Sequence, residues 1–257
     1  MSTVVDDEWV AERLDAIRVV DVRDAWEYDG IGHLPGAVNV PFDSFRSESS
    51  GEAGMLPGAD AFGELLGEAG IERGDDVVAY DDTHGVFAAR FLVTCELYGH
   101  SPERLHLLDG DFSAWQLDHS TESEAPDVEP TTYEAAFDEE GPLIDLAEME
   151  AAVDSDAVIA DTREDWEFEE GHVPGAIRLD WRELVDDDSR GLKPEGELRS
   201  ILENRGIVPD RRIVLYCNTA RRISHTYVVL RHLGYGDLAF YEGSLTEWER
   251  EGKPVET

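Results

Sequence analysis

The sequence predicts an α/β fold made of two tandem copies of one domain, each a mainly parallel sheet flanked by helices. Two observations predict it. Short β-branched runs alternate with segments of helical spacing, which is typical of parallel sheets covered on both faces. The same motifs also occur twice, in the same order, along the 257 residues. A chain of this length has room for two modest domains.

The repeat is visible in two pairs of segments. Residues 19–38 read VVDVRDAWEYDGIGHLPGAV, and residues 158–177 read VIADTREDWEFEEGHVPGAI. Further along, residues 77–83 (VVAYDDT) align with residues 213–219 (IVLYCNT). Chance does not produce such an ordered set of matches, so the two halves are homologous domains. The first block aligns Asp21, Arg23, Trp26 and Glu27 with Asp161, Arg163, Trp166 and Glu167.

The expected secondary structure follows the repeat. Short apolar or β-branched runs predict buried strands, and apolar residues at helical spacing predict the longer helices. Ligands of parallel sheets bind beyond the carboxyl ends of the strands, which points to the residues after Tyr80 and Tyr216. The expected elements are strands at 18–22, 77–80, 157–160 and 212–216, and helices at 24–28, 86–98, 164–168 and 223–233.

The boundary between the two domains is expected in a polar, acidic stretch. Residues 120–130 read STESEAPDVEP, contain two prolines and lack periodicity, which is typical of an exposed linker. We therefore predict a first domain over 1–119, a linker over 120–132 and a second domain over 133–257.

The charge of the chain excludes some partners. Its 59 acidic and 21 basic side chains give a net charge of −38. Binding to nucleic acid or to an anionic membrane surface requires a basic footprint, so neither is an expected partner. The acids are spread along the chain, and Lys193 and Lys253 are its only lysines. Such a surface is typical of proteins that work in multimolar salt, which predicts a halophilic, archaeal source.

The location predicted is the cytoplasm. No window of about 18 apolar residues exists, so no membrane span is expected. The first residues, MSTVVDD, lack the basic start and apolar stretch of a secretory signal. The two cysteines, Cys95 and Cys217, lie far apart and without zinc-ligand spacing, which suits a reducing compartment.

The strongest candidate for chemistry is Cys217, directly after a predicted strand. A short loop that turns into a helix aims backbone N–H groups inward and, with the positive helix end, forms an anion cradle. A cysteine at the start of such a loop is a competent thiolate nucleophile. The alternative is an inert buried cysteine beside surface arginines that pair with acids. The candidate loop consists of Cys217, Asn218, Thr219, Ala220, Arg221 and Arg222.

The first copy lacks the same chemistry. Asp81 stands where the second copy has Cys217, and Gly85 and Val86 stand where it has the two arginines. The first domain is therefore predicted to be non-catalytic. A metal site at Asp81 and Asp82 is disfavoured because no histidine or further acid lies at ligand spacing.

Taken together, these motifs resemble the tandem-domain rhodaneses, a family of sulfurtransferases. The marks are the two Asp-x-Arg segments, the Gly-His-x-Pro-Gly-Ala turns at 32–37 and 171–176, and the strand, cysteine and loop at 213–222. The resemblance implies two rhodanese-like domains, the second catalytic. It implies a Cys217 persulfide that carries sulfur from a small anionic donor to cyanide, a small thiol or a protein thiol, without a cofactor. It also implies that the loop, and Arg163, can bind substrate.

Several alternatives remain open at the level of sequence. The two arginines favour a doubly charged donor, hence thiosulfate over 3-mercaptopyruvate. A persulfide carrier or regulatory module that serves a protein partner uses the same cysteine. Rhodanese-like phosphatases need Cys-x5-Arg, which would place arginine where Ile223 stands, so that activity is disfavoured. Arg163 is open between substrate contact and a salt bridge, because Arg23 occupies its place in the first copy. Ala220 replaces the glycine of similar loops in small single-domain rhodaneses.

Overall fold

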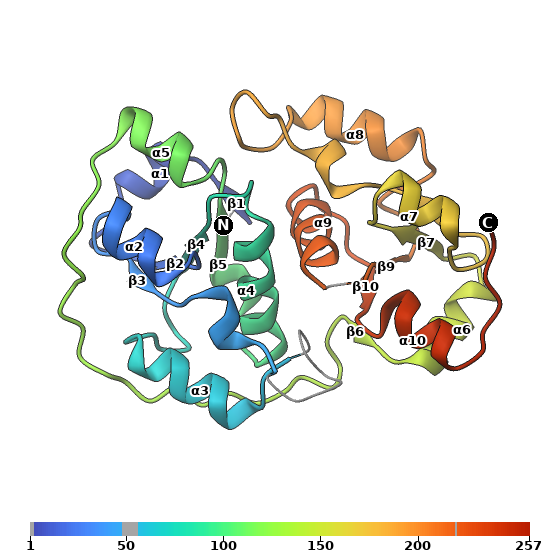
Figure 1. Cartoon of the computed structure of the whole chain (residues 1–257), viewed down its shortest axis with the longest axis horizontal. Coiled ribbons are helices and arrows are strands. Elements are labelled where there is room, and N and C mark those ends of the chain that lie inside the picture. The colour runs from blue at the N-terminus through green and yellow to red at the C-terminus, as the bar shows by residue number, and fades with distance from the viewer. Residues whose placement is uncertain (1–2, 48–55, 219) are drawn as a thin grey trace. The chain divides into compact units, whose positions relative to one another are not determined.

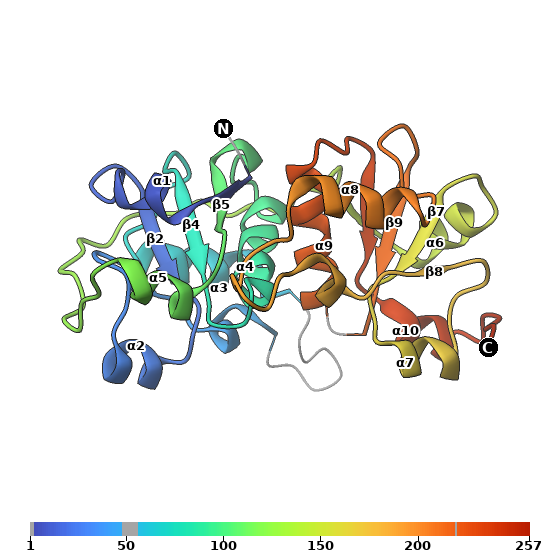
Figure 2. The same ribbon diagram turned by 90° about the horizontal axis from the view of Figure 1, so that it is seen from above.

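Each copy of the repeat forms a five-stranded sheet in which every described strand pair is parallel (Figures 1 and 2). In this computed structural model, which describes residues 3–47, 56–218 and 220–257, the chain divides into two units. Unit 1 comprises Met1–Asp138 and Asp187–Leu192, and unit 2 comprises Glu139–Asp186 and Lys193–Thr257. The predicted fold class, two tandem α/β domains with mainly parallel sheets, is confirmed.

The elements of unit 1 alternate between strand and helix. Its strands are β1 (Val4–Val5), β2 (Arg18–Asp21), β3 (Val38–Asn39), β4 (Val77–Tyr80) and β5 (Leu105–Leu108). Its helices are α1 (Asp7–Ala11), α2 (Ala25–Ile31), η1 (Phe42–Phe45), α3 (Ala59–Glu68), α4 (Val86–Leu97), η2 (Pro102–Arg104) and α5 (Phe112–Asp118), of which η1 and η2 are 3₁₀ turns.

Unit 2 repeats this order. Its strands are β6 (Leu143–Ile144), β7 (Val158–Asp161), β8 (Ile177–Arg178), β9 (Ile213–Tyr216) and β10 (Leu238–Tyr241). Its helices are α6 (Leu146–Val153), α7 (Asp165–Glu170), η3 (Trp181–Leu184, 3₁₀), α8 (Glu195–Glu203), α9 (Arg221–His232) and α10 (Ser244–Arg250).

The strand order places β4 and β9 at the centre of their sheets. It is β1-β5-β4-β2-β3 in unit 1 and β6-β10-β9-β7-β8 in unit 2. All four residues of β4 and of β9 are buried, as expected for strands covered on both faces. The carboxyl end of each central strand therefore lies at the middle of the sheet edge, where parallel sheets bind ligands.

Helices cover both faces of each sheet. In unit 1 one face packs on residues of α1, α2 and α5, and α4 packs on the other (Figure 2). In unit 2 the corresponding faces carry α6 with α10, and α9. The predicted strands and helices correspond to observed elements with boundary shifts of at most three residues, and α9 begins at Arg221 rather than near Ile223. The helix begins early because Ala220 completes the turn in the left-handed conformation.

A buried ion pair ties the two sequence blocks together in each unit. In unit 1 the carboxylate of Asp21 accepts hydrogen bonds from the Arg23 guanidinium, at 2.5–3.1 Å, and from the Tyr80 hydroxyl at 2.5 Å. Arg23 also donates to the carbonyl of Gly32 at 2.7 Å. The pair is almost fully buried, with side-chain exposures of 0% for Asp21 and 3% for Arg23. It joins β2, β4 and the turn that follows α2.

The segment that follows the last helix of each unit, here called its tail, is held in the same way in both units. The indole N–H of Trp115 donates to the carbonyl of Ser120 at 3.0 Å, and that of Trp248 donates to Pro254 at 2.7 Å. The tails then form single β-bridges, His33 with Glu122 and His172 with Glu256. The start of the predicted linker thus packs on unit 1.

The later part of that stretch also contacts unit 1. The hydroxyl of Thr131 donates to the carbonyl of Ile71 at 2.8 Å, and the division between the units falls after Asp138. Unit 1 further includes residues 187–192, where the Arg190 guanidinium binds Asp111 at 2.7 Å and Asp82 at 3.3 Å. Among the described residues, no helix is long and apolar enough to cross a bilayer.

Replacing Asp21 with alanine tests the buried pair. Asp21→Ala strands a buried guanidinium, and we expect a loss of about 3–5 kcal/mol in the free energy of unfolding, measured by denaturant titration in molar KCl. The matched control is Asp43→Ala, which breaks the exposed Arg46–Asp43 pair and should cost less than about 1 kcal/mol. Equal losses in the two variants would contradict the role given to the buried pair.

Candidate functional site

The site is built at the carboxyl end of β9. Cys217 follows Tyr216 directly, its side chain is fully buried, and its carbonyl accepts a hydrogen bond from the N–H of Leu245 at 3.4 Å. The phenol of Tyr216 bonds to Asp161 and accepts the N–H of Val173 at 3.0 Å, so the strand end is anchored one residue before the cysteine. Neither Cys217 nor Cys95 forms a disulfide.

The loop after Cys217 turns sharply into α9. Ala220 lies at φ 57°, ψ −29°, in the left-handed region that costs an L-residue about 1–2 kcal/mol. His84 holds the same place in the first copy at φ 55°. Strain of this kind is typical of functional sites. It lets α9 begin at Arg221, so both arginines lie in its first turn and add positive charge to the positive end of the helix dipole.

Glu167 of α7 fastens the loop. Its carboxylate accepts the side-chain amide of Asn218 at 3.2 Å and Nη2 of Arg222 at 3.3 Å, and Nη1 of Arg222 bonds to its other oxygen. Glu167 is only 8% exposed. Burial alone would raise the pKa of Glu167, but the hydrogen bonds and charge of Arg222 outweigh it and lower that pKa. The carboxylate is therefore held in its charged form.

The Arg222 guanidinium interacts electrostatically with Cys217. Burial by itself disfavours the charged guanidinium, but the hydrogen bond that Arg222 donates to Glu167 and the attraction of Cys217 raise the pKa of Arg222. The Arg222 guanidinium is therefore a charged group in the first turn of α9, after Cys217. Thr219, the remaining residue of the predicted loop, lies outside the described part of the chain.

Arg163 repeats the geometry of Arg23. Its guanidinium binds Asp161 at 2.6–3.0 Å and the carbonyl of Gly171 at 2.6 Å, and its side chain is 3% exposed. Of the two roles left open by the sequence, this geometry supports the salt bridge. Arg163 also lines a pocket of about 330 Å³ between α7 and α10, together with Glu167, Asn218 and the exposed Trp166. Solvent in this pocket can reach the side of the loop.

The first copy shows what the loop can bind. The carboxylate of Asp81 accepts four backbone N–H groups, those of Thr83 (2.7 Å), Gly85 (2.8 Å), Phe87 (2.7 Å) and Ala88 (3.0 Å). Burial raises the pKa of Asp81 although these bonds act to lower it. The loop and the first turn of α4 thus form an anion cradle, and the chain fills it with its own carboxylate.

The alignment of the two copies predicts a similar cradle in the second copy. In the alignment of Cys217 with Asp81, the N–H groups of Gly85, Phe87 and Ala88 correspond to those of Arg221, Ile223 and Ser224. The Ser224 N–H donates instead to the carbonyl of Ala220 at 3.0 Å, so the expectation that backbone N–H groups converge on the sulfur concerns those of Arg221 and Ile223.

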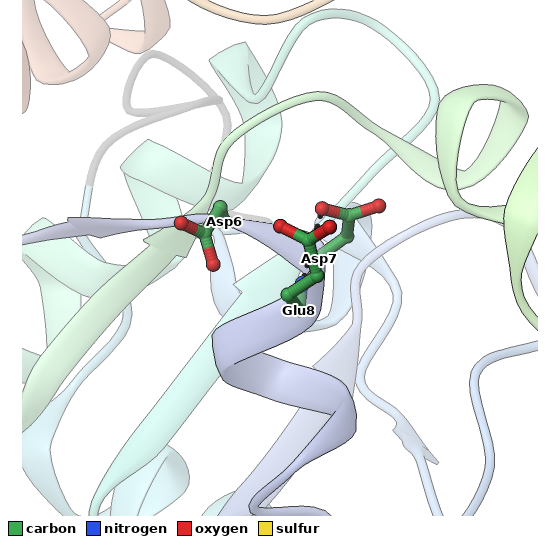
Figure 3. A group of neighbouring side chains, drawn as sticks. All are labelled: Asp6, Asp7 and Glu8. Atoms are coloured by element: carbon green, nitrogen blue, oxygen red, sulfur yellow. Dashed lines mark hydrogen bonds between the residues drawn. The ribbon is translucent and has the colours of Figure 1, made fainter.

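A cluster of carboxylates elsewhere is explained by helix capping. Asp6, Asp7 and Glu8 lie together at the start of α1 (Figure 3). Asp6 accepts the N–H of Trp9 at 2.7 Å, and Asp7 pairs with His119 at 2.9 Å. Asp6 and Glu8 are exposed and Asp7 is half-buried, and we assign no metal to them.

Sequence reasoning missed Glu167. The repeat matches Glu167 with Glu27, but the spacing gives no sign that a residue 50 positions before the loop pairs with Arg222. Nor does the sequence indicate that the indoles of Trp115 and Trp248 hold the segments that follow the last helix of each unit.

Comparisons with known proteins agree with the motifs. A family model described as "Rhodanese-like domain" matches residues 6–118 and 145–251. Thiosulfate sulfurtransferase from Pseudomonas aeruginosa is 31% identical, over 98% of this chain and 96% of the relative. Sulfur carrier protein TtuD from Thermus thermophilus is 29% identical, over 95% and 93%. The crystal structure of SseA from Escherichia coli, a 3-mercaptopyruvate sulfotransferase, has a TM-score of 0.84 at 27% identity, over 95% of this chain and 99% of SseA. The family expected from the motifs is confirmed.

The filled cradle makes a prediction for unit 1. In Asp81→Asn an amide NH₂ faces backbone N–H donors, so we expect a loss of about 1–3 kcal/mol in the free energy of unfolding. The control is Asp127→Asn, which removes the same charge from an exposed side chain and should be nearly neutral. If both variants unfold at the same midpoint as the wild type, the four hydrogen bonds to Asp81 do not stabilise the loop.

Proposed function

Because this chain belongs to the rhodanese family, with two tandem domains, we propose that it is a thiosulfate sulfurtransferase that works through a persulfide on Cys217. The observation that carries the proposal is the placement of Cys217: a buried thiol on a strained loop, beside a fixed arginine and at the N-terminus of a 12-residue helix. The proposed catalytic domain is the second copy, predicted over 133–257, of which unit 2 takes up Glu139–Asp186 and Lys193–Thr257, and the first copy, predicted over 1–119, is non-catalytic.

The reaction has two displacements. The Cys217 thiolate attacks the outer sulfur of thiosulfate, the sulfur–sulfur bond of the donor breaks, and sulfite leaves with the bonding electrons. The outer sulfur remains on Cys217 as a persulfide. Cyanide or a thiolate then attacks that sulfur and releases the Cys217 thiolate, which completes a ping-pong cycle. The chemistry needs no metal or organic cofactor.

Each loop residue has a part in this proposal. The N–H groups of the loop and of the first turn of α9 stabilise the anionic sulfur, in the manner of an oxyanion hole. Arg221 attracts the donor, and Arg222 stabilises the thiolate. Asn218 links the loop to Glu167, and Ala220 makes the turn into α9, while Thr219, outside the described residues, stays a predicted donor contact. Arg163 supports the wall of the neighbouring pocket rather than the reacting atoms.

Two other sulfur-transfer roles remain as alternatives. SseA supports 3-mercaptopyruvate as donor, and TtuD supports a persulfide carrier that serves a protein thiol. All three roles use the same cysteine, so the assay must compare donors and acceptors. Turnover with a protein thiol but not with cyanide would favour the carrier.

We also propose that the protein is cytoplasmic and halophilic. The support is its net charge of −38, with only two lysines. Activity should rise with KCl and fall on dialysis to low salt, because salt screens the repulsion among surface carboxylates. Full activity after dialysis would contradict the halophilic assignment.

The first assay is thiocyanate formation from thiosulfate and cyanide in molar KCl. Wild-type protein incubated with thiosulfate should gain the mass of one sulfur atom on the peptide that contains Cys217, and Cys217→Ser should lose both the added mass and turnover. Cys95→Ala is the control, since Cys95 lies buried in α4 of unit 1. Turnover that survives in Cys217→Ser would overturn the mechanism.

A further inference from the structure

Glu167 connects α7 to both ends of the reactive loop. One oxygen accepts the backbone N–H of Glu164 at 3.1 Å, which caps the helix. The same carboxylate also accepts the amide of Asn218, directly after the cysteine, and the guanidinium of Arg222, five residues after it. A single buried side chain therefore holds the loop at its beginning and at its end.

Comparison with the first copy shows that the helix-capping contact of the glutamate occurs without the contacts to the loop. Glu27 accepts the backbone N–H of Asp24 at 3.2 Å, in the same capping box at the start of α2. Val86 stands at the position of Arg222, so no guanidinium is there to pair. The ion pair to the loop therefore belongs to the copy that carries the cysteine and is not required by the capping box.

The ion pair of Glu167 with Arg222 changes the net charge of the loop to which a donor anion binds. Arg222 is 18% exposed and Glu167 9% by side chain, so the pair is largely removed from solvent. Dissolved salt screens such a buried pair much less than a surface pair. The positive charge of Arg222 is thus offset in place, and the two arginines of the sequence do not amount to two net positive charges.

We propose that Glu167 is a positioning and donor-specificity residue of the sulfur transfer. It holds the Arg222 guanidinium beside Cys217, and it lowers the net charge of the loop by one. The site consequently takes a singly charged donor, a thiol of the 2-oxo acid class, as well as doubly charged thiosulfate. This inference rests on the function proposed above.

The test compares Glu167→Gln with its matched control Glu27→Gln, which alters the same capping box in the first copy. Two ratios are measured in molar KCl. The first is kcat/KM for thiosulfate over kcat/KM for 3-mercaptopyruvate. The second is the rate of Cys217 alkylation by iodoacetate, an anion, over the rate with neutral iodoacetamide. Both members of each ratio need the same thiolate, so each ratio reports the charge of the site.

Glu167→Gln should raise both ratios about tenfold, because one unscreened charge close to the sulfur favours the more negative reactant. Glu27→Gln should change neither ratio. Glu167→Asp keeps the charge and should keep both ratios near the wild-type values, even where a shorter side chain lowers the absolute rates and the melting temperature.

Unchanged ratios in Glu167→Gln, with equal losses for both donors, would overturn the proposal and leave Glu167 as a helix cap. Equal shifts in Glu27→Gln would overturn it as well. If the wild type makes no thiocyanate from either donor, the proposed function fails, whereas the alkylation ratio still decides the effect of Glu167 on the charge of the loop.

Discussion

The buried pair of Asp161 with Arg163 is the interaction on which the second domain depends. Asp161 ends β7, and its carboxylate also binds the phenol of Tyr216 at the end of β9. Arg163 reaches the carbonyl of Gly171 in the turn after α7. Desolvation makes such a pair costly unless every partner is present. Because all of these partners must be in place, the ion pair fixes the strand end that carries Cys217 against the helix that carries Glu167.

The two copies show how one scaffold serves two purposes. Both loops use a left-handed residue, Ala220 or His84, to turn from a central strand into a helix. In the first copy Asp81 fills the resulting cradle with its own carboxylate. In the second copy Cys217 stands at that position with a shorter side chain. The two loops thus share a turn and differ in the group at the end of the central strand, which is a carboxylate in the first copy and a thiol in the second.

Charge is distributed on two scales in this protein. The surface is strongly acidic, which keeps the molecule dispersed but repels anions at long range. A small anionic donor therefore needs local positive charge at its site. The first turn of α9 supplies it with Arg221 and Arg222, and Glu167 then removes part of it. The balance at the site is consequently a property of three side chains and not of the net charge of the chain.

The sequence by itself determined the two-domain α/β fold, the family and the position of Cys217. Periodicity and repeated motifs carry that information because strands, turns and loops are local features. The hydrogen-bond partners of Arg163, Arg222 and Glu167 were decided only by the tertiary structure. Arg163 is committed to Asp161, and Arg222 to a carboxylate 55 residues away. Ion pairing depends on which side chains the packing of helices and strands brings within about 3 Å, and a spacing along the chain does not contain that distance.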